Sequence, residues 1–589
     1  MASSTSKQES PPRSTERGTE LAAAIARCRG AFAGIGLFSL FINVLMLTGP
    51  LFMLQIYDRV LSSHSVPTLI ALAVLAGALY LLQGVLDAIR GRVLLRIGTS
   101  LDESLSGRVY DAVIRLPLKT RGVGNGLQPV RDLDQLRGFL SSPGPAALSD
   151  LPWMPFYVFV CYLFHPWIGI AAAAGAIVLF CLTLVTEAAT RRPARMAANL
   201  ASSRHALAEA SRRNAEVLQA LGMGHRLAAR WGETNQAYLR SQARTADIAG
   251  GLGSLSRVLR MLLQSLVLGL GAYLVIVGEA TAGIIIASAI LVSRAVAPVE
   301  LAITHWRGFV AARQSWHRLS ELLALLPKSE EPLALPPPRT RLDVEGVSAV
   351  PPGERRVVLQ EVSFALEAGA GLGVIGPSAA GKSSLARLLV GVWAPARGKV
   401  RLDGAALEQW SPERLGGHIG YLPQDVELFD GTVAENIARF DAEAEAETII
   451  AAAKNADVHE LILGLPEGYE TRIGEAGAAL SAGQRQRIAL ARALYGAPFL
   501  VVLDEPNSNL DADGEQALTQ AILGVRERGG IAIVIAHRPS ALAAVDQVLV
   551  LGQGRQQAFG PKDEVLRSVL RPTPVTLVPA ATTLAEASS

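Results

Sequence analysis

The residues of this chain that are best suited to chemistry form a short glycine-rich turn. It lies between a strand-like apolar run, Leu372–Ile375, and a helix-compatible run, Ser384–Val390. In such a turn, backbone N–H groups at a helix start surround a phosphate, a lysine bridges two phosphates and a serine hydroxyl binds Mg²⁺. The sequence therefore predicts a nucleotide-binding loop made of Gly376, Pro377, Ser378, Ala379, Ala380, Gly381, Lys382, Ser383 and Ser384.

Two adjacent carboxylates follow another apolar run, Phe499–Leu503. A strand that ends in acids could simply be meeting solvent, but the phosphate loop favours a catalytic role. We expect Asp504 to hold Mg²⁺ together with Ser383, and Glu505 to polarise the attacking water as catalytic base. The predicted reaction is hydrolysis of a nucleoside triphosphate.

A second turn with phosphate-binding character lies about twenty residues before these acids. It opens the helical run Arg485–Leu494. A serine hydroxyl and backbone N–H groups at a helix start suit a γ-phosphate, although the simpler alternative is an ordinary N-capped helix. Because the first loop already forms one complete cradle, we expect this turn to close over a nucleotide held by another copy of the chain, through Ser481, Gly483 and Gln484.

These motifs together make residues 342–569 resemble the ATPase domain of ABC transporters. The resemblance implies ATP and Mg²⁺ as ligands. It assigns Gln424 to the loop that senses the metal site, and Asp511 to the segment beside the nucleotide. It also makes His537 the histidine near the γ-phosphate. Glu475 matches a coupling motif of exporters, which argues against an importer.

Two departures from the family pattern affect the predicted site. Ala482 stands where the family usually has glycine, and we expect one added methyl group to be tolerated. No aromatic ring occurs in Ala349–Pro352, where the family usually stacks adenine. The sequence therefore does not predict how the base is held.

The composition predicts a membrane protein with at least two domains. The 589 residues are 50% hydrophobic and 18% charged, and the mean hydropathy is +0.31. A net charge of +3 is too small to favour nucleic acid as a partner. Three cysteines, Cys28, Cys161 and Cys181, show no disulfide or metal-site spacing, so we expect buried, apolar roles for them.

Six apolar runs are long enough to cross a lipid bilayer. They are approximately 33–54, 66–86, 151–164, 168–185, 259–277 and 283–301. The sixth is the weakest, because Arg294, Pro298 and Glu300 interrupt it. These residues could face water in a gating segment, or they could pair inside the helical bundle.

Basic residues predict the orientation of the spans. The segment before the first span and the long segments 90–147 and 188–254 are rich in Arg and Lys, whereas the other three loops are short and hold one basic residue, Arg59. The positive-inside rule therefore places the long basic segments, both termini and the ATPase domain of this multi-pass membrane protein in the cytoplasm. The long basic segments have helical spacing and should reach beyond the bilayer.

A Pro-rich break at residues 329–338 separates the membrane part from an α/β pattern. We predict a disordered tail over 1–28, a membrane domain over 29–328, a linker over 329–340, an ATPase domain over 341–570 and a flexible tail over 571–589. The fold class is an α-helical six-span membrane domain of the ABC exporter type (type I, also called type IV), fused to an α/β phosphate-loop NTPase of the ABC type.

Three further segments narrow the resemblance to bacterial type I secretion ATPases, in the PrtD-like branch that secretes proteases. They are Met46–Leu61, Phe139–Trp153 and Asp504–Asp511, the last with Asn507 and Asn509 where general exporters more often have Thr and Ala. We also expect no N-terminal peptidase-like domain, because only about thirty polar residues precede the first span.

The resemblance implies a homodimer in the lipid bilayer of a Gram-negative bacterial inner membrane that works with a periplasmic membrane-fusion adaptor and a TolC-type outer-membrane channel. Its cargo would be an unfolded protein with a C-terminal signal, typically one with glycine-rich Ca²⁺-binding (RTX) repeats. An exporter of lipid, drug or peptide would share the same ATPase. A regulator or ATP-gated channel without transport is disfavoured, since Lys382, Asp504, Glu505 and His537 are all present.

Overall fold

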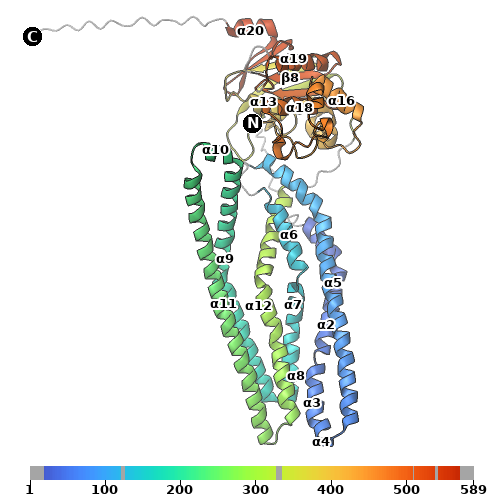
Figure 1. Cartoon of the computed structure of the whole chain (residues 1–589), viewed down its shortest axis with the longest axis vertical. Helices are drawn as coiled ribbons and strands as arrows, with labels where there is room; N and C mark the ends of the chain where they lie inside the picture. The colour runs from blue at the N-terminus through green and yellow to red at the C-terminus, as the bar shows by residue number, and fades with distance from the viewer. Residues whose placement is uncertain (1–18, 121–125, 327–333, 509, 537–541, 571–589) are drawn as a thin grey trace, which may run out of the picture. The chain divides into compact units, whose positions relative to one another are not determined.

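The computed structural model of the chain describes residues 19–120, 126–326, 334–508, 510–536 and 542–570. The chain divides into two compact units: residues 1–117 and 122–327 form the first, and residues 118–121 and 328–589 form the second. The first unit is helical, and the second combines a mixed sheet with helices (Figure 1). The predicted tail 571–589 lies outside the described residues.

The helical unit consists almost entirely of α-helices, several of them long. In chain order they are α1 (Thr19–Arg27), α2 (Arg29–Leu45), α3 (Thr48–Gln55), α4 (Leu61–Ser63), α5 (Val66–Lys119), α6 (Gln128–Leu140), α7 (Gly144–Asp150), α8 (Met154–Phe164), α9 (Pro166–Arg213), α10 (Ala215–Ala220), α11 (Gly224–Ile276) and α12 (Ala282–Leu325). A π-helical turn, Ile56–Val60, joins α3 to α4.

Six helical segments of the described residues are long and apolar enough to cross a membrane, and each predicted span lies within one of them, apart from one residue at the end of the fifth. They are Arg29–Ser63, Val66–Lys119, Gly144–Phe164, Pro166–Arg213, Gly224–Ile276 and Ala282–Leu325. Only 6% of the apolar stretch in the second segment is buried inside the unit, against 53% in the sixth. Most of the apolar surface therefore needs lipid or another chain to cover it.

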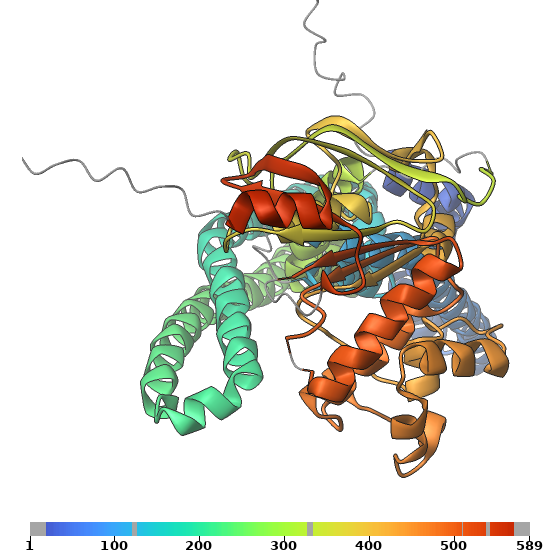
Figure 2. The ribbon, with the colours of Figure 1, turned by 90° about the horizontal axis from the view of Figure 1, so that it is seen from above.

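Several of these helices are far longer than a bilayer requires. Helix α5 has 54 residues, α9 has 48 and α11 has 53. At 1.5 Å per residue they are roughly 70 to 80 Å long, whereas about 20 residues cross the hydrocarbon core. Helices α9 and α11 run side by side and are joined by the short α10 (Figures 1 and 2). This agrees with the helical character predicted for the long basic segments.

The N-terminal segment is more ordered than the sequence suggested. We predicted a tail without regular structure up to residue 28, but residues 19–27 form α1. Its Leu21 is 1% exposed and packs in a cluster with Leu101 and Leu105 of α5 and Leu319 of α12. Burial of one helical face against two long helices stabilises a segment whose composition alone looked disordered.

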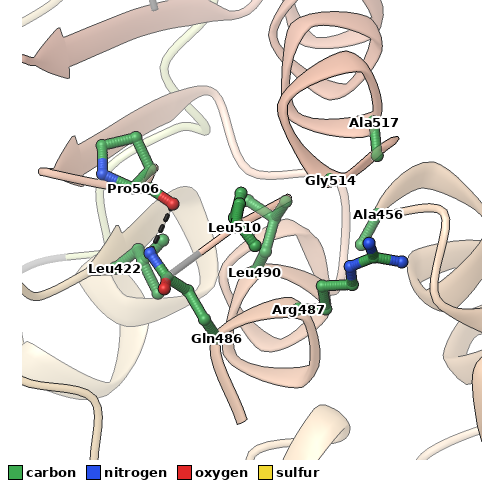
Figure 3. A pocket seen from close by; sticks show the side chains of 9 residues that line it. All are labelled: Leu422, Ala456, Gln486, Arg487, Leu490, Pro506, Leu510, Gly514 and Ala517. Atoms are coloured by element: carbon green, nitrogen blue, oxygen red, sulfur yellow. Dashed lines mark hydrogen bonds between the residues drawn. The ribbon is translucent and has the colours of Figure 1, made fainter. Parts of the chain in front are cut away.

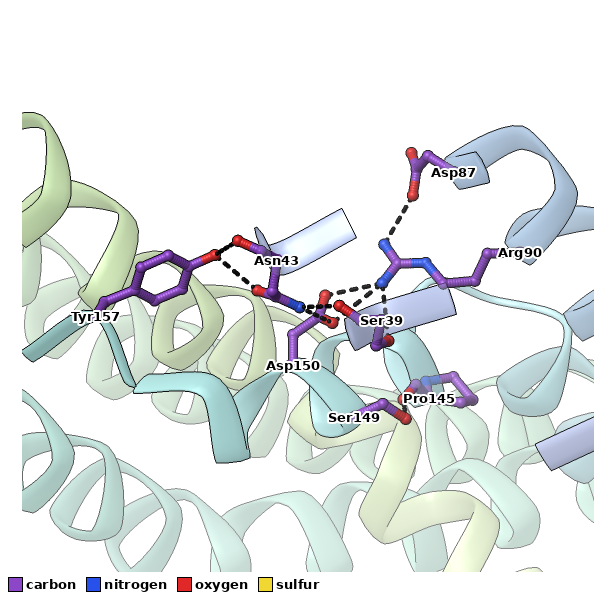
Figure 4. Close-up of polar contacts among 8 residues, drawn as sticks. All are labelled: Ser39, Asn43, Asp87, Arg90, Pro145, Ser149, Asp150 and Tyr157. Carbon is purple, nitrogen blue, oxygen red and sulfur yellow. Dashed lines mark hydrogen bonds and ion pairs between the residues drawn. The ribbon is translucent and has the colours of Figure 1, made fainter. Parts of the chain in front are cut away.

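A buried polar network ties α2, α5, α7 and α8 together (Figure 4). The guanidinium of Arg90 forms an ion pair with Asp150 at 3.0 Å, and the second Asp150 contact comes from the Asn43 amide, also at 3.0 Å. The Tyr157 hydroxyl donates to the Asn43 side-chain oxygen at 2.9 Å. Tyr157 is 0% exposed and Asn43 2%. Polar groups this deep in a bundle fix the register of its helices.

The sixth span is continuous despite its irregular sequence. Pro298 lies inside α12, which runs without a break from Ala282 to Leu325. Glu300 forms an ion pair with Arg260 of α11 at 3.0 Å. For Glu300 this favours pairing within the bundle over a water-facing role, whereas Arg294 is exposed.

The cysteines do not all follow the expectation of burial. Cys161 is buried, Cys28 is half-buried and Cys181 is exposed, and all three are free thiols. Cys181 lies in the apolar part of α9, so the exposed helix surface around it is also apolar.

The second unit is built on a ten-stranded sheet in the order β5-β4-β1-β2-β10-β9-β3-β8-β7-β6 within the described residues. Strands β9, β3, β8, β7 and β6 are mutually parallel, whereas β5, β4, β1 and β2 pair antiparallel. The strands are β1 (Arg341–Ala349), β2 (Leu359–Glu367), β3 (Gly371–Ile375), β4 (Arg397–Leu402), β5 (Ala405–Ala406), β6 (Ile419–Leu422), β7 (Leu500–Asp504), β8 (Ile531–Ile535), β9 (Gln547–Gly552) and β10 (Arg555–Pro561).

Helices cover both faces of the parallel part of this sheet. Because side chains alternate along a strand, Leu500 and Val502 of β7 join one hydrophobic cluster and Val501 and Leu503 join another. The first cluster includes α13 (Lys382–Leu389), and the second includes α16 (Ala446–Asn455), α18 (Ala482–Leu494) and α19 (Ala512–Glu527). The remaining helices are α14 (Pro412–His418), α15 (Val433–Ile437), α17 (His459–Leu463) and α20 (Lys562–Leu570).

Candidate nucleotide site

The predicted phosphate loop connects β3 to α13, and its backbone requires glycine at two positions. Gly376 has φ +154°, and a Cβ atom there would lie 2.1 Å from the Leu551 carbonyl oxygen. Gly381 has φ +93°, and its Cβ would lie 2.9 Å from the Val358 oxygen. A side chain at either position would push the loop off the sheet edge. The exposed part of the loop is Pro377, Ser378 and Ala379.

Lys382 lies folded over this loop. Its side chain is nearly buried, and Nζ donates hydrogen bonds to the carbonyl oxygens of Gly376 and Pro377, both at 3.0 Å. Burial lowers the pKa of Lys382, while the nearby carboxylates of Glu505 and Asp504 act in the opposite direction. The ammonium is therefore held at the loop centre, where a phosphate group would meet it.

Asp504 ends β7 next to the start of α13. The Ser383 hydroxyl lies close to its carboxylate. Asp504 is 2% exposed, and its burial raises its pKa, an effect that the neighbouring Ser383 hydroxyl opposes. Its Oδ1 atom is buried without a hydrogen-bond partner among the residues described. A buried carboxylate oxygen of this kind suits a hard cation, so the residues present fit Mg²⁺.

Glu505 leaves the sheet in a left-handed conformation, with φ +51°. Its N–H donates to the Ile535 carbonyl oxygen at 3.0 Å, which fixes it against the end of β8. A non-glycine residue in this region is strained and is kept there by its surroundings. His537, the predicted partner, lies two residues beyond β8 and outside the described residues.

Gln424 follows β6 by two residues and is exposed. Leu422 at the end of β6 pairs with Leu503, one residue before Asp504. Strands β3, β6, β7 and β8 are parallel neighbours, so their carboxyl ends meet at one sheet edge. The structure therefore brings the phosphate loop, Gln424, Asp504 and Glu505 together.

The predicted second phosphate turn is an N-terminal cap in this structure. The Ser481 hydroxyl accepts a hydrogen bond from the Gln484 N–H at 3.2 Å, and the Gln484 side chain accepts one from the Ser481 N–H at 2.8 Å. Ser481 and Ala482 are exposed, while Gly483 and Gln484 are half-buried. The hydroxyl proton of Ser481 is still available to donate, so capping and ligand binding are compatible.

This turn and the phosphate loop of the same chain belong to different layers. Helix α18 packs in the hydrophobic cluster on one face of the sheet, and α13 packs on the other. Among the described residues, no hydrogen bond or ion pair joins residues 481–484 to residues 376–384.

Asp511 contacts α18, and Glu475 precedes this helix in the chain. Asp511 caps α19 by accepting from the Gly514 N–H at 2.9 Å, and it pairs with Arg487 of α18 at 2.7 Å. These two contacts, led by the Gly514 hydrogen bond, lower the pKa of Asp511. Glu475 is exposed in a 3₁₀ turn, Glu475–Gly477, shortly before α18.

Comparisons with known proteins agree with this geometry. Residues 359–508 match the family model described as ABC transporter, and residues 32–299 match the one for the ABC transporter transmembrane region. The chain is 59% identical over 559 residues to the type I secretion system ATP-binding protein PrsD of Rhizobium meliloti, covering 95% of this chain and 96% of that protein.

The chain belongs to the type I secretion family of ABC transporters. This exporter is also similar to the cyclolysin secretion/processing ATP-binding protein CyaB of Bordetella pertussis and to the leukotoxin translocation ATP-binding protein LktB of Mannheimia haemolytica. Each is 29% identical, with 92% of this chain and 77% of the relative covered. A bacterial Atm1-family ABC exporter solved with ATP bound shares the fold, with a TM-score of 0.80, 25% identity and coverage of 92% and 97%.

These findings confirm the predicted fold class and the predicted transport-coupled ATPase. The exporter is an integral, multi-pass membrane protein that binds nucleotide. The roles of individual site residues are taken up below as proposals.

Sequence reasoning missed two residues of the exporter that contact this site. Arg387 of α13 lies near Asp504 and near Tyr421 of β6, and its positive charge acts to lower the pKa of both. Gln486 of α18 is buried and bonded to the segment after Glu505. Both are polar residues at helical spacing from recognised motifs. Periodicity could place them on the helix but could not show which neighbour they reach.

Proposed function

We propose that this exporter works as a homodimer that hydrolyses ATP with Mg²⁺ to move an unfolded protein with a C-terminal signal across the inner membrane. The observation that carries the cargo class is the 59% identity to a type I secretion ATP-binding protein over nearly the full length of both chains. Similarity this extensive covers the membrane unit as well as the ATPase unit, so it bears on what is transported.

The residues at the sheet edge take distinct roles in this proposal. Ser383 and Asp504, with Gln424, hold Mg²⁺, which when bound neutralises charge on the β- and γ-phosphates. Lys382 exchanges its two carbonyl contacts for the phosphates. Glu505 accepts a proton from the attacking water, and His537 contacts the γ-phosphate. The orphaned oxygen of Asp504 and the strained backbone of Glu505 support this assignment.

The ATPase site is completed by a second copy. Ser481, Gly483 and Gln484 of one chain close over the nucleotide that rests on the phosphate loop of the other. The position of α18 and α13 on opposite faces of the sheet supports this arrangement, because a single chain then presents its two phosphate-binding turns on different layers. Closure by two ATP molecules would favour one conformation of the membrane unit over another. Glu475 is the proposed coupling residue.

The cellular setting is part of the same proposal. Both termini and the ATPase unit would lie in the cytoplasm of a Gram-negative cell, and the basic loop segments support this orientation. A periplasmic membrane-fusion adaptor and a TolC-type channel would carry the cargo to the outside, and proteins with RTX repeats are the cargo class expected. The names of two relatives, which refer to cyclolysin secretion and to leukotoxin translocation, support a protein cargo.

The cargo class can be tested with the purified exporter in liposomes. The proposal predicts that ATPase activity responds to a peptide carrying the C-terminal signal of a protein encoded beside this exporter. The same peptide with its residues scrambled is the control. An ATPase that responds to a lipid, a drug or a short unrelated peptide, but not to the signal, would instead favour an exporter of those molecules. This alternative needs the test because an Atm1-family ABC exporter has the same fold.

A further inference from the structure

The segment that follows Glu505 is held from the side by α18. Gln486 of this helix is 3% exposed, and its Nε2 donates a hydrogen bond to the Pro506 carbonyl oxygen (Figure 3). The same nitrogen lies 3.5 Å from the Ser508 hydroxyl. One buried amide thus contacts two residues of the segment that begins at the proposed catalytic base.

The surroundings of this amide are otherwise largely apolar. Leu422, Leu490 and Leu510 line the same small pocket (Figure 3). A carboxamide is unfavourable among leucines unless it is hydrogen-bonded, and an apolar side chain would fill such a pocket equally well. A glutamine here therefore points to a requirement for the hydrogen bond itself.

The bond reaches backbone that is already constrained. Glu505 holds its left-handed φ of +51° between the Ile535 carbonyl oxygen, which accepts its N–H, and the Ser508 N–H, which donates to its carbonyl oxygen at 3.3 Å. The Pro506 carbonyl is the next acceptor along the chain. A displacement of Gln486 would therefore act on the backbone that aims the Glu505 carboxylate.

The next residue of α18 holds the other end of the same segment. Arg487 is mostly buried, and its guanidinium pairs with Asp511 at 2.7 Å. Asp511 in turn accepts from the Gly514 N–H, at the start of α19. Two consecutive side chains of one helix thus fix residues 506 and 511, the two ends of the link between β7 and α19.

Helix α18 begins at the turn that contains Ser481. It is capped by reciprocal hydrogen bonds between Ser481 and Gln484 and is anchored by buried residues such as Ile488 and Leu494. Six residues separate Ser481 from Arg487, which is roughly 9 Å along the axis. A helix this short and well packed moves as a rigid body, so a shift of its first turn reaches residues 486 and 487 directly.

We propose that Gln486 and Arg487 are positioning residues that make the geometry of Glu505 in one nucleotide site depend on what Ser481 binds in the other. The inference rests on the proposed function, in which the Ser481 turn contacts the nucleotide of the partner copy. Each α18 then links two sites: its first turn touches one ATP, and its second turn sets the catalytic base beside the other. Hydrolysis at the two sites becomes cooperative in ATP.

The test compares Gln486→Met with the wild-type, full-length exporter in nanodiscs. Methionine preserves volume in a leucine-lined pocket but cannot donate to Pro506. We expect equilibrium binding of a fluorescent ATP analogue to stay within twofold, kcat to fall roughly tenfold, and the Hill coefficient for ATP to fall to 1 from a wild-type value between 1 and 2. Gln520→Met, on the exposed face of α19, is the matched control and should change none of these.

A second variant keeps the test decisive if Gln486→Met does not fold. Arg487→Met removes the pair with Asp511, and we expect it to lower kcat and the Hill coefficient in the same way. Unchanged kcat and cooperativity in either folded variant would overturn the inference. So would a parallel loss of ATP binding, kcat and thermal stability, because that pattern indicates a merely structural role.

Failure of the proposed function would look different. If the wild-type exporter itself has a Hill coefficient of 1 and its kcat does not depend on Ser481, then the two-copy site is wrong. If the wild type is cooperative and depends on Ser481, but Gln486→Met and Arg487→Met match it, then only the positioning role is wrong.

Discussion

The Ser383 hydroxyl lies beside the Asp504 carboxylate and lowers its pKa, and this contact joins the first turn of α13 to the last residue of β7. The two residues come from motifs that lie more than a hundred positions apart in the sequence. Their contact leaves Oδ1 of Asp504 buried and free of hydrogen bonds to the described residues. The site therefore contains a buried carboxylate oxygen that receives no hydrogen bond from the described residues.

Replacing Asp504 by asparagine should stabilise the nucleotide-free exporter at neutral pH. Burial raises the pKa of Asp504, so the folded protein binds its proton more tightly than the unfolded chain does. The favourable contribution of this carboxyl is complete below its unfolded pKa, about 3.9, and is lost as the pH rises through its folded pKa. Asp504→Asn should consequently melt higher than wild type at pH 8, with the difference shrinking toward pH 4, as followed by thermal unfolding in detergent.

Asp511→Asn is the control for this prediction, and its melting temperature should change in the opposite direction. The Gly514 N–H and Arg487 lower the pKa of Asp511, so its contribution is present above the unfolded pKa and is lost as the pH falls. This variant should melt slightly lower than wild type at pH 8.

Asp504→Asn should also lose the extra thermal stabilisation that ATP with Mg²⁺ gives the exporter over ATP alone. An Asp504→Asn protein that melts lower than wild type at pH 8, yet retains the Mg²⁺ effect, would contradict the assignment of the metal ligand.

Replacing Glu505 by glutamine should separate ATP binding from hydrolysis. The amide keeps the shape of the side chain but cannot accept the proton of the attacking water. We expect kcat to fall by about 10²- to 10⁴-fold, with ATP affinity unchanged and the closed dimer accumulating. Single-turnover hydrolysis and size-exclusion chromatography with Mg²⁺-ATP would measure both effects. Wild-type turnover in this variant would show that Glu505 is not the base.

Breaking the Arg90–Asp150 pair should destabilise the membrane unit strongly. The two side chains are about 10% exposed, so removing either one leaves a buried charge. We expect Arg90→Ala or Asp150→Ala to lower the free energy of unfolding by roughly 3 to 5 kcal/mol each, and the double variant to lose much less than the sum. Unfolding of the exporter in mixed micelles gives these values.

Arg137→Ala provides the matched control for this pair. Its partner Asp134 is exposed and its partner Asp102 only half-buried, and the Arg137 side chain is 46% exposed. Pairs of this kind contribute about 0 to 1 kcal/mol. Equal effects of Arg137→Ala and Arg90→Ala, or strict additivity of the Arg90 and Asp150 changes, would show that the buried network does not hold the bundle together.

Much of the fold could be predicted because its signals are local. A run of about twenty apolar residues predicts a span wherever the chain places it, and a strand, glycine turn and helix in succession predict the phosphate loop around Lys382. The same reasoning placed Asp504 at a strand end. Such residues can be located from their position relative to a known motif, because the motif and the strand or helix beside it follow one another in the sequence.

The remaining features depend on contacts between distant segments. Helix α1 forms because Leu21 is buried against α5 and α12, and the composition of the segment does not reveal this contact. Arg90 and Asp150 are 60 positions apart, and Gln486 looks like any polar residue of an amphipathic helix. Ser481 shows a different limit, since a helix cap and a ligand contact require the same residue type at the same place.

The central claim is that each ATP site is shared between two chains, and heterodimers of full-length exporter carrying two different tags test it most directly. In one heterodimer, Lys382→Met lies in one chain and Ser481→Arg in the other. In the second, both changes lie in the same chain and the partner is wild type. Sites shared in trans leave one intact site in the first heterodimer and none in the second. The account therefore predicts ATPase activity in the first only, and activity confined to the second would contradict it.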